Sequence, residues 1–160
     1  MEQVLEETKR RTRELESALK AYRISAKDVH VGAGGELVVE DILFRPGRAE
    51  IGKKGKEVLR KIAEILKTRK EYIRVDGHTD SDPIRKSRKL WRSNWHLSAV
   101  RAARVVEFLV ECGVNPKRIS IGAYAQYRPV ATNKTAAGKR KNRRVEIWLY
   151  EPVESLKSSK

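Results

Sequence analysis

The sequence predicts an α/β fold: a two-layer sandwich with a mixed sheet, elements in the order β-α-β-α-β-β, and helices mainly on one face. Three observations lead to this prediction. Two segments carry apolar residues at helical spacing, short β-prone segments flank each of them, and two further strand-like segments follow the second helix. Strands that alternate with helices in this way need right-handed crossovers, which place the helices against the sheet.

The individual elements follow from local patterns. Apolar residues at helical spacing predict one helix at residues 53–68 and a second at residues 95–111. Ser93 or Asn94 can cap the start of the second helix. Gly113 ends it, because glycine adopts a left-handed backbone with the least steric cost. One strand or two short ones are expected at residues 36–44, and further strands at residues 72–77, 119–124 and 143–150. A long polar loop is expected at residues 126–142, and it allows the last two strands to form an antiparallel pair.

The first 22 residues are predicted to form a polar helix with a thin apolar stripe. Fewer than three clean heptads support a coiled coil, so two interpretations remain: a helix packed lightly on its own domain, and one that pairs with a second copy. The glycine-rich segment at residues 31–35 is expected to form a turn. It is not a phosphate loop, because no Gly-Lys-Ser/Thr follows it.

The chain therefore divides into three predicted parts. Residues 1–35 form an N-terminal helix and linker, residues 36–152 form the α/β domain, and residues 153–160 form a C-terminal tail. The 39% of hydrophobic residues suits a single core of modest size.

The charge points to an anionic partner without identifying it. Lys and Arg outnumber Asp and Glu by 36 to 21, which gives a net charge of +15. A chain this basic favours polyanions or carboxylate-rich polymers, and nucleic acid, an acidic membrane and the bacterial cell wall all qualify.

Neither a secretory signal nor a membrane span is predicted from the sequence. Met1 leads directly into a glutamate-rich stretch, and no segment approaches the length of about 20 apolar residues that a membrane helix needs. We expect either a cytosolic protein or a fragment that lacks its targeting segment. Cys112 is the only cysteine, which excludes an internal disulfide, and we expect it to be a small buried thiol.

A candidate binding site lies in the loop after residue 77 and along the second helix. Asp80 offers a carboxylate, and Asn94 and Arg101 are seven residues apart, so about two helical turns bring them to one side of the helix. One acid and one guanidinium match a zwitterion, with Asp80 taking an ammonium and Arg101 a carboxylate. The alternative is that Asp80 caps a turn and Arg101 is a solvated helix residue.

Several motifs follow one another in a characteristic order. They are Gly77-His78-Thr79-Asp80, Pro83-Ile84, Ser93-Asn94-Trp95 continuing to Ala102, Gly122 to Val130, and Asn142 to Ile147. Together they resemble the motifs of the OmpA-like (OmpA/MotB) peptidoglycan-binding domain over about residues 36–150. The resemblance is closest to the C-terminal periplasmic domain of the flagellar stator protein MotB, because of the Pro-Ile and Ser-Asn-Trp variants. Where MotB-like chains usually have Gly-Tyr-Gly, this chain has Ala123-Tyr124-Ala125, which is expected to stiffen that turn.

The resemblance implies non-covalent binding of peptidoglycan through the diaminopimelate of the stem peptide. The family positions that hold its ammonium and its carboxylate fall on Asp80 and Arg101. Positions that line the same pocket fall on Thr79, Asn94 and Leu97. No cofactor, metal ligand or catalytic residue is implied.

The family's Asn-Arg-Arg-Val motif falls on residues 142–145. One of Arg143 and Arg144 then faces the ligand and the other is structural, and the sequence leaves open which of them does so.

The resemblance also implies a cellular setting. The domain would lie in the periplasm, as part of an inner-membrane-anchored protein whose membrane segment is absent from this chain, and it would form a homodimer and work with a membrane ion-channel subunit. An anchoring module of another envelope complex, such as a secretion system or an outer-membrane lipoprotein, remains the alternative, because related modules share the Ser-Asn-Trp variant.

Nucleic acid is a rival partner at this charge. Two basic stretches, at residues 85–92 and 134–144, are of the kind that gives non-specific, salt-sensitive binding. No helix-turn-helix, stacking-aromatic or zinc signature accompanies them, so we expect no nucleic-acid partner.

An enzyme is a weaker rival. His78, Asp80, Asp82 and His96 are close in sequence and could form a metal site or an acid–base pair. The chain has no His-Glu-x-x-His motif, and its one cysteine lacks a base and an orienting group. We therefore expect a binding protein without catalytic activity.

Overall fold

The computed structural model describes residues 2–45, 47–84 and 90–151. Two predicted segments lie outside these ranges: the tail at residues 153–160, and residues 85–89 of the basic stretch at residues 85–92. The elements are α1 (Glu2–Ala21), β1 (Val29–Val31), β2 (Leu37–Val39), α2 (Lys53–Lys67), β3 (Tyr72–His78), α3 (Asn94–Glu111), η1 (Pro116–Arg118), β4 (Ile119–Ala123), α4 (Ala136–Asn142) and β5 (Arg144–Tyr150).

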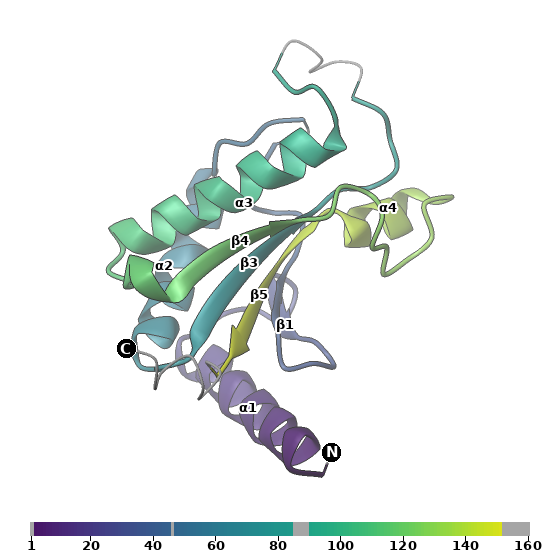
Figure 1. The fold of residues 1–160 in the computed structure, drawn as a ribbon. Helices are drawn as coiled ribbons and strands as arrows, with labels where there is room; N and C mark the ends of the chain where they lie inside the picture. Colours follow the sequence, from purple (N-terminus) through teal and green to yellow (C-terminus); the bar gives the residue numbers. More distant parts are fainter. Residues whose placement is uncertain (1, 46, 85–89, 152–160) are drawn as a thin grey trace, which may run out of the picture.

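The described strands form one mixed sheet, in the order β1-β2-β5-β3-β4, with α2 and α3 packed on one face (Figure 1). This confirms the predicted two-layer α/β sandwich. The parallel pair β3–β4, with Val75 opposite Ile121, is joined by the crossover through α3. The last strand, β5, is antiparallel to both of its neighbours, with Ile147 opposite Leu37 of β2 and opposite Val75 of β3.

Three local expectations are wrong. The last two strands do not pair with each other, because β3 lies between β4 and β5. The predicted polar loop contains helix α4. Thr135 caps the start of this helix, and its hydroxyl accepts a 3.0 Å hydrogen bond from the N–H of Gly138. This helix is too short and too polar to leave an apolar stripe in the sequence.

The third correction concerns the start of the domain, where a hairpin forms. Val29 of β1 pairs with Val39 of β2, on either side of the glycine-rich turn. The predicted strand at residues 36–44 ends early, and beyond it Phe44 makes only an isolated bridge with Ile51. The chain leaves the sheet after Val39, and this departure carries Asp41 towards the end of β3.

The core lies between the sheet and the helices. Leu59, Ile62 and Leu66 of α2 and Val105 and Leu109 of α3 pack on the apolar side chains that alternate along β3 and β5. All five are buried, at 7% exposure or less. These two helices are those that the apolar spacing predicted.

Helix α1 shares this core through its C-terminal half. Leu15 and Leu19 are buried in the same cluster, whereas Val4 and Leu5 are mostly exposed. Arg11 of α1 also donates a 2.7 Å hydrogen bond to Glu71, just before β3. Of the two interpretations of this helix, packing on its own domain therefore describes its C-terminal half. None of the helices in the described ranges is long and apolar enough to cross a membrane.

The close approach of α3 to β3 positions the candidate site. A Cβ atom on Gly77 would lie 2.2 Å from the carbonyl oxygen of Ser98, so only glycine allows the helix to sit this near the strand. The group that approaches Gly77 is the backbone of α3.

Candidate functional site

Asp80 is held rigidly two residues beyond the end of β3. The hydroxyl of Thr79 donates to the carbonyl oxygen of Asp80 at 2.9 Å, and the Thr79 N–H donates to the carbonyl oxygen of Ala125 at 2.9 Å. The N–H of Asp82 donates to Oδ1 of Asp80 at 2.8 Å. Both Thr79 and Asp80 are buried, so the carboxylate is preorganised.

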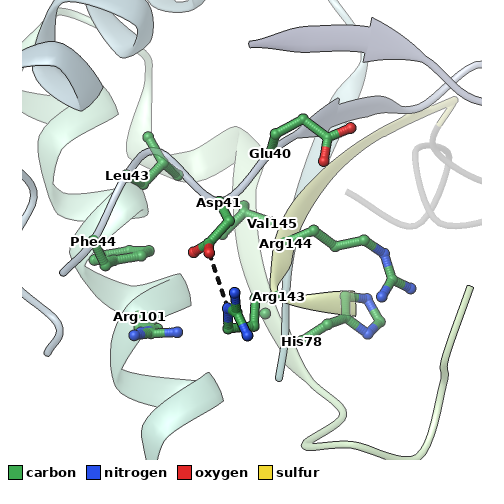
Figure 2. Close-up of a pocket in the computed structure, with 10 residues that line it drawn as sticks. Glu40, Asp41, Leu43, Phe44, His78, Arg101, Arg143, Arg144 and Val145 are labelled. Carbon is green, nitrogen blue, oxygen red and sulfur yellow. Dashed lines mark hydrogen bonds and ion pairs between the residues drawn. The ribbon is translucent and has the colours of Figure 1, made fainter. Parts of the chain in front are cut away.

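Arg143 bridges two carboxylates. Its Nη1 donates to Oδ2 of Asp80 at 2.6 Å. Its Nε donates to Oδ2 of Asp41 at 2.9 Å, a contact that Figure 2 shows. Burial by itself lowers the pKa of Arg143, but the hydrogen bonds to Asp80 and Asp41 outweigh it and raise the pKa overall. The guanidinium therefore stays charged and ties the two acids together.

Arg144 turns away from this pair of acids. Its Nε donates to Glu146 at 2.7 Å, and its two terminal nitrogens donate to the carbonyl oxygens of Asn142 and Arg128. A guanidinium with these internal partners holds the loop before β5 to the sheet. Of the two adjacent arginines, Arg143 is the one in contact with Asp80.

Arg101 is the second guanidinium at the site, and it is only 6% exposed. Its Nε and Nη2 donate to the carbonyl oxygens of Arg48 and Arg45, at 2.8 and 3.3 Å, and it lies 4.9 Å from the centre of the Phe44 ring. Among the described residues, no carboxylate lies within ion-pair distance of it. Burial lowers the pKa of Arg101 to about 10, which leaves it charged at neutral pH.

These groups meet in one pocket at the end of β3 (Figure 2). Asp41, Phe44, Arg101 and Arg143 line it, with Arg101 and Arg143 side by side in the view. Asp80 joins the same group through Arg143. The site thus contains two acids and two guanidiniums, and only Arg101 lacks an acidic partner within the described ranges.

The other predicted residues support the pocket. Leu97, in the first turn of α3, is 6% exposed. The side-chain amide of Asn94 donates to the carbonyl oxygen of Asp82 at 3.1 Å, which ties the Asp80 loop to the helix. The helix itself is capped by Ser93, whose hydroxyl accepts from the N–H of His96.

Sequence reasoning missed Asp41 and Phe44. Both fall in the segment that was expected to form one strand or two short ones, where alternate side chains would have faced the sheet's two sides. The only available hint was the poor alternation of residues 36–44.

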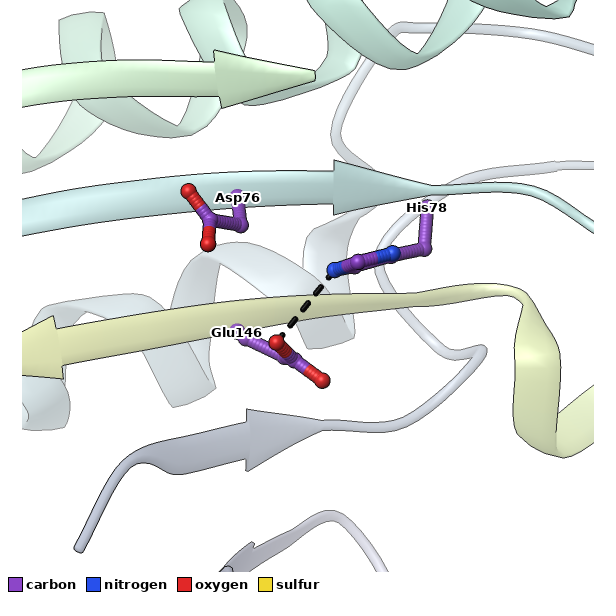
Figure 3. Close-up of side chains that lie close together, drawn as sticks. All are labelled: Asp76, His78 and Glu146. Carbon is purple, nitrogen blue, oxygen red and sulfur yellow. Dashed lines mark ion pairs between the residues drawn. The ribbon is translucent and has the colours of Figure 1, made fainter. Parts of the chain in front are cut away.

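A second cluster, Asp76, His78 and Glu146, has the composition of a metal site (Figure 3). One potential ligand atom from each lies within 4.8 Å of the others, and Nε2 of His78 is 3.3 Å from Oε1 of Glu146. Arg74 donates twice to Asp76, at 2.8 and 3.0 Å, and Arg144 donates to Glu146 at 2.7 Å. Because two guanidiniums already balance the two acids, we interpret this cluster as an internal ion network of the sheet.

Comparison with known proteins gives the family. The chain belongs to the OmpA family, whose sequence profile matches residues 43–143. This confirms the resemblance that the motifs indicated.

Individual relatives are consistent with this membership. Motility protein B of Bacillus subtilis (strain 168) is 39% identical over 117 residues, which are 70% of this chain and 43% of that protein. The chain therefore spans less than half the length of this relative.

Two solved structures share the fold at 30% identity. The periplasmic domain of Helicobacter pylori MotB superposes with a TM-score of 0.70, over 78% of this chain and 80% of that one. The cell wall anchor of the T6SS from Pseudomonas aeruginosa superposes with a TM-score of 0.73, over 88% of this chain and 96% of that one.

Proposed function

We propose that this chain is a peptidoglycan-binding module that holds the diaminopimelate of a stem peptide between Asp80 and Arg101. The observation that carries the proposal is the environment of Arg101, a buried guanidinium without an acidic partner among the described residues. Desolvation without a counter-ion is costly, and a ligand carboxylate would relieve that cost.

The ligand must bring both charges. The end of the diaminopimelate side chain carries an ammonium and a carboxylate on one carbon, so it is a compact zwitterion. Asp80 and Asp41 offer carboxylates to the ammonium, while Arg101 and Arg143 offer donors to the carboxylate. Charge-assisted hydrogen bonds of this kind contribute roughly 1.5–3 kcal/mol each, so a few of them suffice for reversible attachment.

Binding then requires an exchange of partners. In the unliganded arrangement Arg143 pairs with both Asp80 and Asp41, and an arriving ammonium takes over one of these two pairings. Arg143 becomes free to share the ligand's carboxylate with Arg101. Thr79, Asn94 and Leu97 act in this proposal by fixing the Asp80 loop and the start of α3, and Arg144 acts as a structural residue.

The relatives support a role as an anchor for a larger assembly. They include a motility protein, a periplasmic MotB domain and a cell wall anchor of a secretion system. We favour the periplasmic part of a MotB-like flagellar stator, working as a homodimer with a membrane ion-channel subunit. The alternative is a cell-wall anchor of a secretion system, and deletion of the gene followed by swimming and secretion assays separates the two.

Co-sedimentation with purified peptidoglycan sacculi tests the binding site. The wild-type chain is expected to pellet with the sacculi, and Asp80→Ala and Arg101→Lys are expected to remain in the supernatant. Lysine keeps the charge of Arg101 but loses the planar fork of donors that matches a carboxylate. Arg104→Ala is a matched control, because Arg104 lies one turn further along α3 and is exposed.

Circular dichroism of each variant separates loss of binding from loss of folding. Folded Asp80 and Arg101 variants that pellet as well as the wild type would refute the site. A wild-type chain that stays in the supernatant would refute the function.

A further inference from the structure

Two exposed aromatic side chains stack on each other beside the proposed site. Trp95 is 52% exposed and Tyr127 is 60% exposed, and their ring centroids are 5.2 Å apart with an interplanar angle of 30°. Single exposed apolar residues are common on protein surfaces. Here the two rings come from different elements, the first turn of α3 and the turn after β4, and together present a continuous aromatic surface to solvent.

The same hydrogen-bonded junction holds this aromatic pair and Asp80. The hydroxyl of Ser98 donates to the carbonyl oxygen of Trp95 at 3.1 Å and accepts from the N–H of Ala125 at 3.2 Å. The carbonyl oxygen of Ala125 in turn accepts from the N–H of Thr79, next to Asp80. The pair is therefore fixed relative to the site by the backbone.

On the side of Tyr127, a tight turn sets the position of the ring. The N–H of Tyr127 donates to the carbonyl oxygen of Tyr124 at 3.1 Å, and Ala125 within this turn has a φ of 51°. Tyr127 is two positions after Ala125, so their Cα atoms are at most about 7 Å apart. The aromatic surface thus begins close to the residues that hold Asp80.

The chemistry of the ligand places a sugar a short distance from the diaminopimelate. In peptidoglycan the stem peptide is attached through its first residue to the glycan, and diaminopimelate is the third residue, so roughly 10 Å of extended peptide separates the two. A sugar ring has a face of C–H groups and an edge of hydroxyls. Rigid, amphipathic Trp and Tyr rings suit such a ligand, because they contact the apolar face while water remains at the edge.

We propose that Trp95 and Tyr127 form a carbohydrate-stacking subsite for the glycan strand whose stem peptide occupies Asp80 and Arg101. This inference rests on the proposed function and adds a second class of contact to it. The charged pocket binds the peptide, and the aromatic pair contacts the sugar to which the peptide is joined.

Titration calorimetry with two soluble ligands tests the subsite. One ligand is the disaccharide tripeptide, N-acetylglucosamine–N-acetylmuramic acid carrying alanine, glutamate and diaminopimelate, and the other is the free tripeptide. The wild-type chain is expected to bind the disaccharide tripeptide up to about tenfold more tightly, the range that aromatic stacking supplies. In the double variant Trp95→Ala, Tyr127→Ala this preference is expected to disappear while the affinity for the free tripeptide is unchanged.

Two controls accompany the double variant. Trp95→Phe, Tyr127→Phe keeps aromatic faces and is expected to restore most of the preference. Tyr150→Ala removes another exposed aromatic ring, 40% exposed and edge-to-face with Tyr72, at the opposite end of β5 from Arg144. It is expected to leave both affinities unchanged.

The remaining outcomes overturn the subsite in distinguishable ways. An equal loss of affinity for both ligands would show that the pair only supports the start of α3. A loss of self-association in sedimentation, with both affinities unchanged, would assign the pair to a contact between copies. A wild-type chain that binds neither ligand would refute the proposed function itself and the subsite with it.

Discussion

Arg143 donates a 2.6 Å hydrogen bond from Nη1 to Oδ2 of Asp80, so the acid predicted to receive a ligand's ammonium already holds a guanidinium. The same arginine also holds Asp41. The two acids thus share one guanidinium, and Arg101 forms no ion pair within the described ranges. We therefore expect both arginines to contribute to binding of the proposed zwitterionic ligand, and we expect the stability of the pocket to depend on Arg143.

Replacing Arg143 with methionine is expected to destabilise the domain by about 1–3 kcal/mol at neutral pH, because two partly buried carboxylates lose their shared donor. Urea unfolding at pH 7 measures this loss. Arg140→Met, which removes an exposed arginine of α4, serves as the control. A loss that is equal for the two variants would show that Arg143 has no special role.

Replacing Gly77 with alanine is expected to move α3 away from β3. The new Cβ would meet a backbone carbonyl oxygen, that of Ser98, at 2.2 Å, and overpacking of this kind costs about 1–3 kcal/mol. Because the helix carries Arg101, binding to sacculi should weaken although both charged residues remain. Gly52→Ala is the matched control, since its nearest neighbour, the carbonyl oxygen of Leu43, is 4.0 Å away. Equal melting temperatures for the two variants would contradict the prediction.

Replacing Arg23 with glycine is expected to stabilise the chain. Arg23 has a φ of 57°, and the N–H groups of Arg23 and Ile24 donate to Lys20 and Leu19 in a Schellman arrangement that ends α1. A left-handed conformation costs a residue with a Cβ about 1–2 kcal/mol, so glycine should raise the melting temperature by about 2–4 °C. Arg23→Ala keeps the strain and should bring no gain. A glycine variant that melts at or below the wild-type temperature would rule this out.

Glu146 is expected to make stability depend on pH in acid. Burial by itself raises the pKa of Glu146, but its contacts with His78 and Arg144 outweigh this and lower the pKa to about 2. A carboxyl whose pKa is lowered by folding contributes stability above its ordinary pKa, near 4.5, and this contribution is lost as the pH falls towards 2.

The variant Glu146→Gln isolates this effect. Its difference in unfolding free energy from the wild type should be largest at neutral pH and should narrow steadily between pH 4.5 and pH 2. Urea titrations across that range measure the difference. A gap that stays constant with pH would show that the charge of Glu146 contributes nothing to stability.

Local patterns in the sequence predict much of the fold. Helices α2 and α3 differ from their predicted ranges by one residue, because an apolar stripe is a property of a short segment. The same reasoning brings Asp80 to the end of β3 and places Arg101 on α3. Their roles in binding stay predictions.

Contacts between distant segments are what the sequence does not disclose. Nothing near Asp41 indicates that it meets Arg143, about a hundred residues later, because that contact depends on where the chain leaves β2. The place of β5 in the sheet is equally hidden, since apolar alternation shows that a strand exists and not which strands flank it. The partnership of Arg143 and the inward turn of Arg144 follow from that placement.

The position of β5 also has a consequence for how the chain is made. The segment at residues 144–150 follows the other four strands of the described sheet in the sequence, yet it lies between β2 and β3 and hydrogen-bonds to both. Until it emerges from the ribosome, the hairpin of β1 and β2 has no strand that pairs it with β3 and β4. The nascent domain therefore remains an incomplete sheet with two open edges, and it closes in one late step.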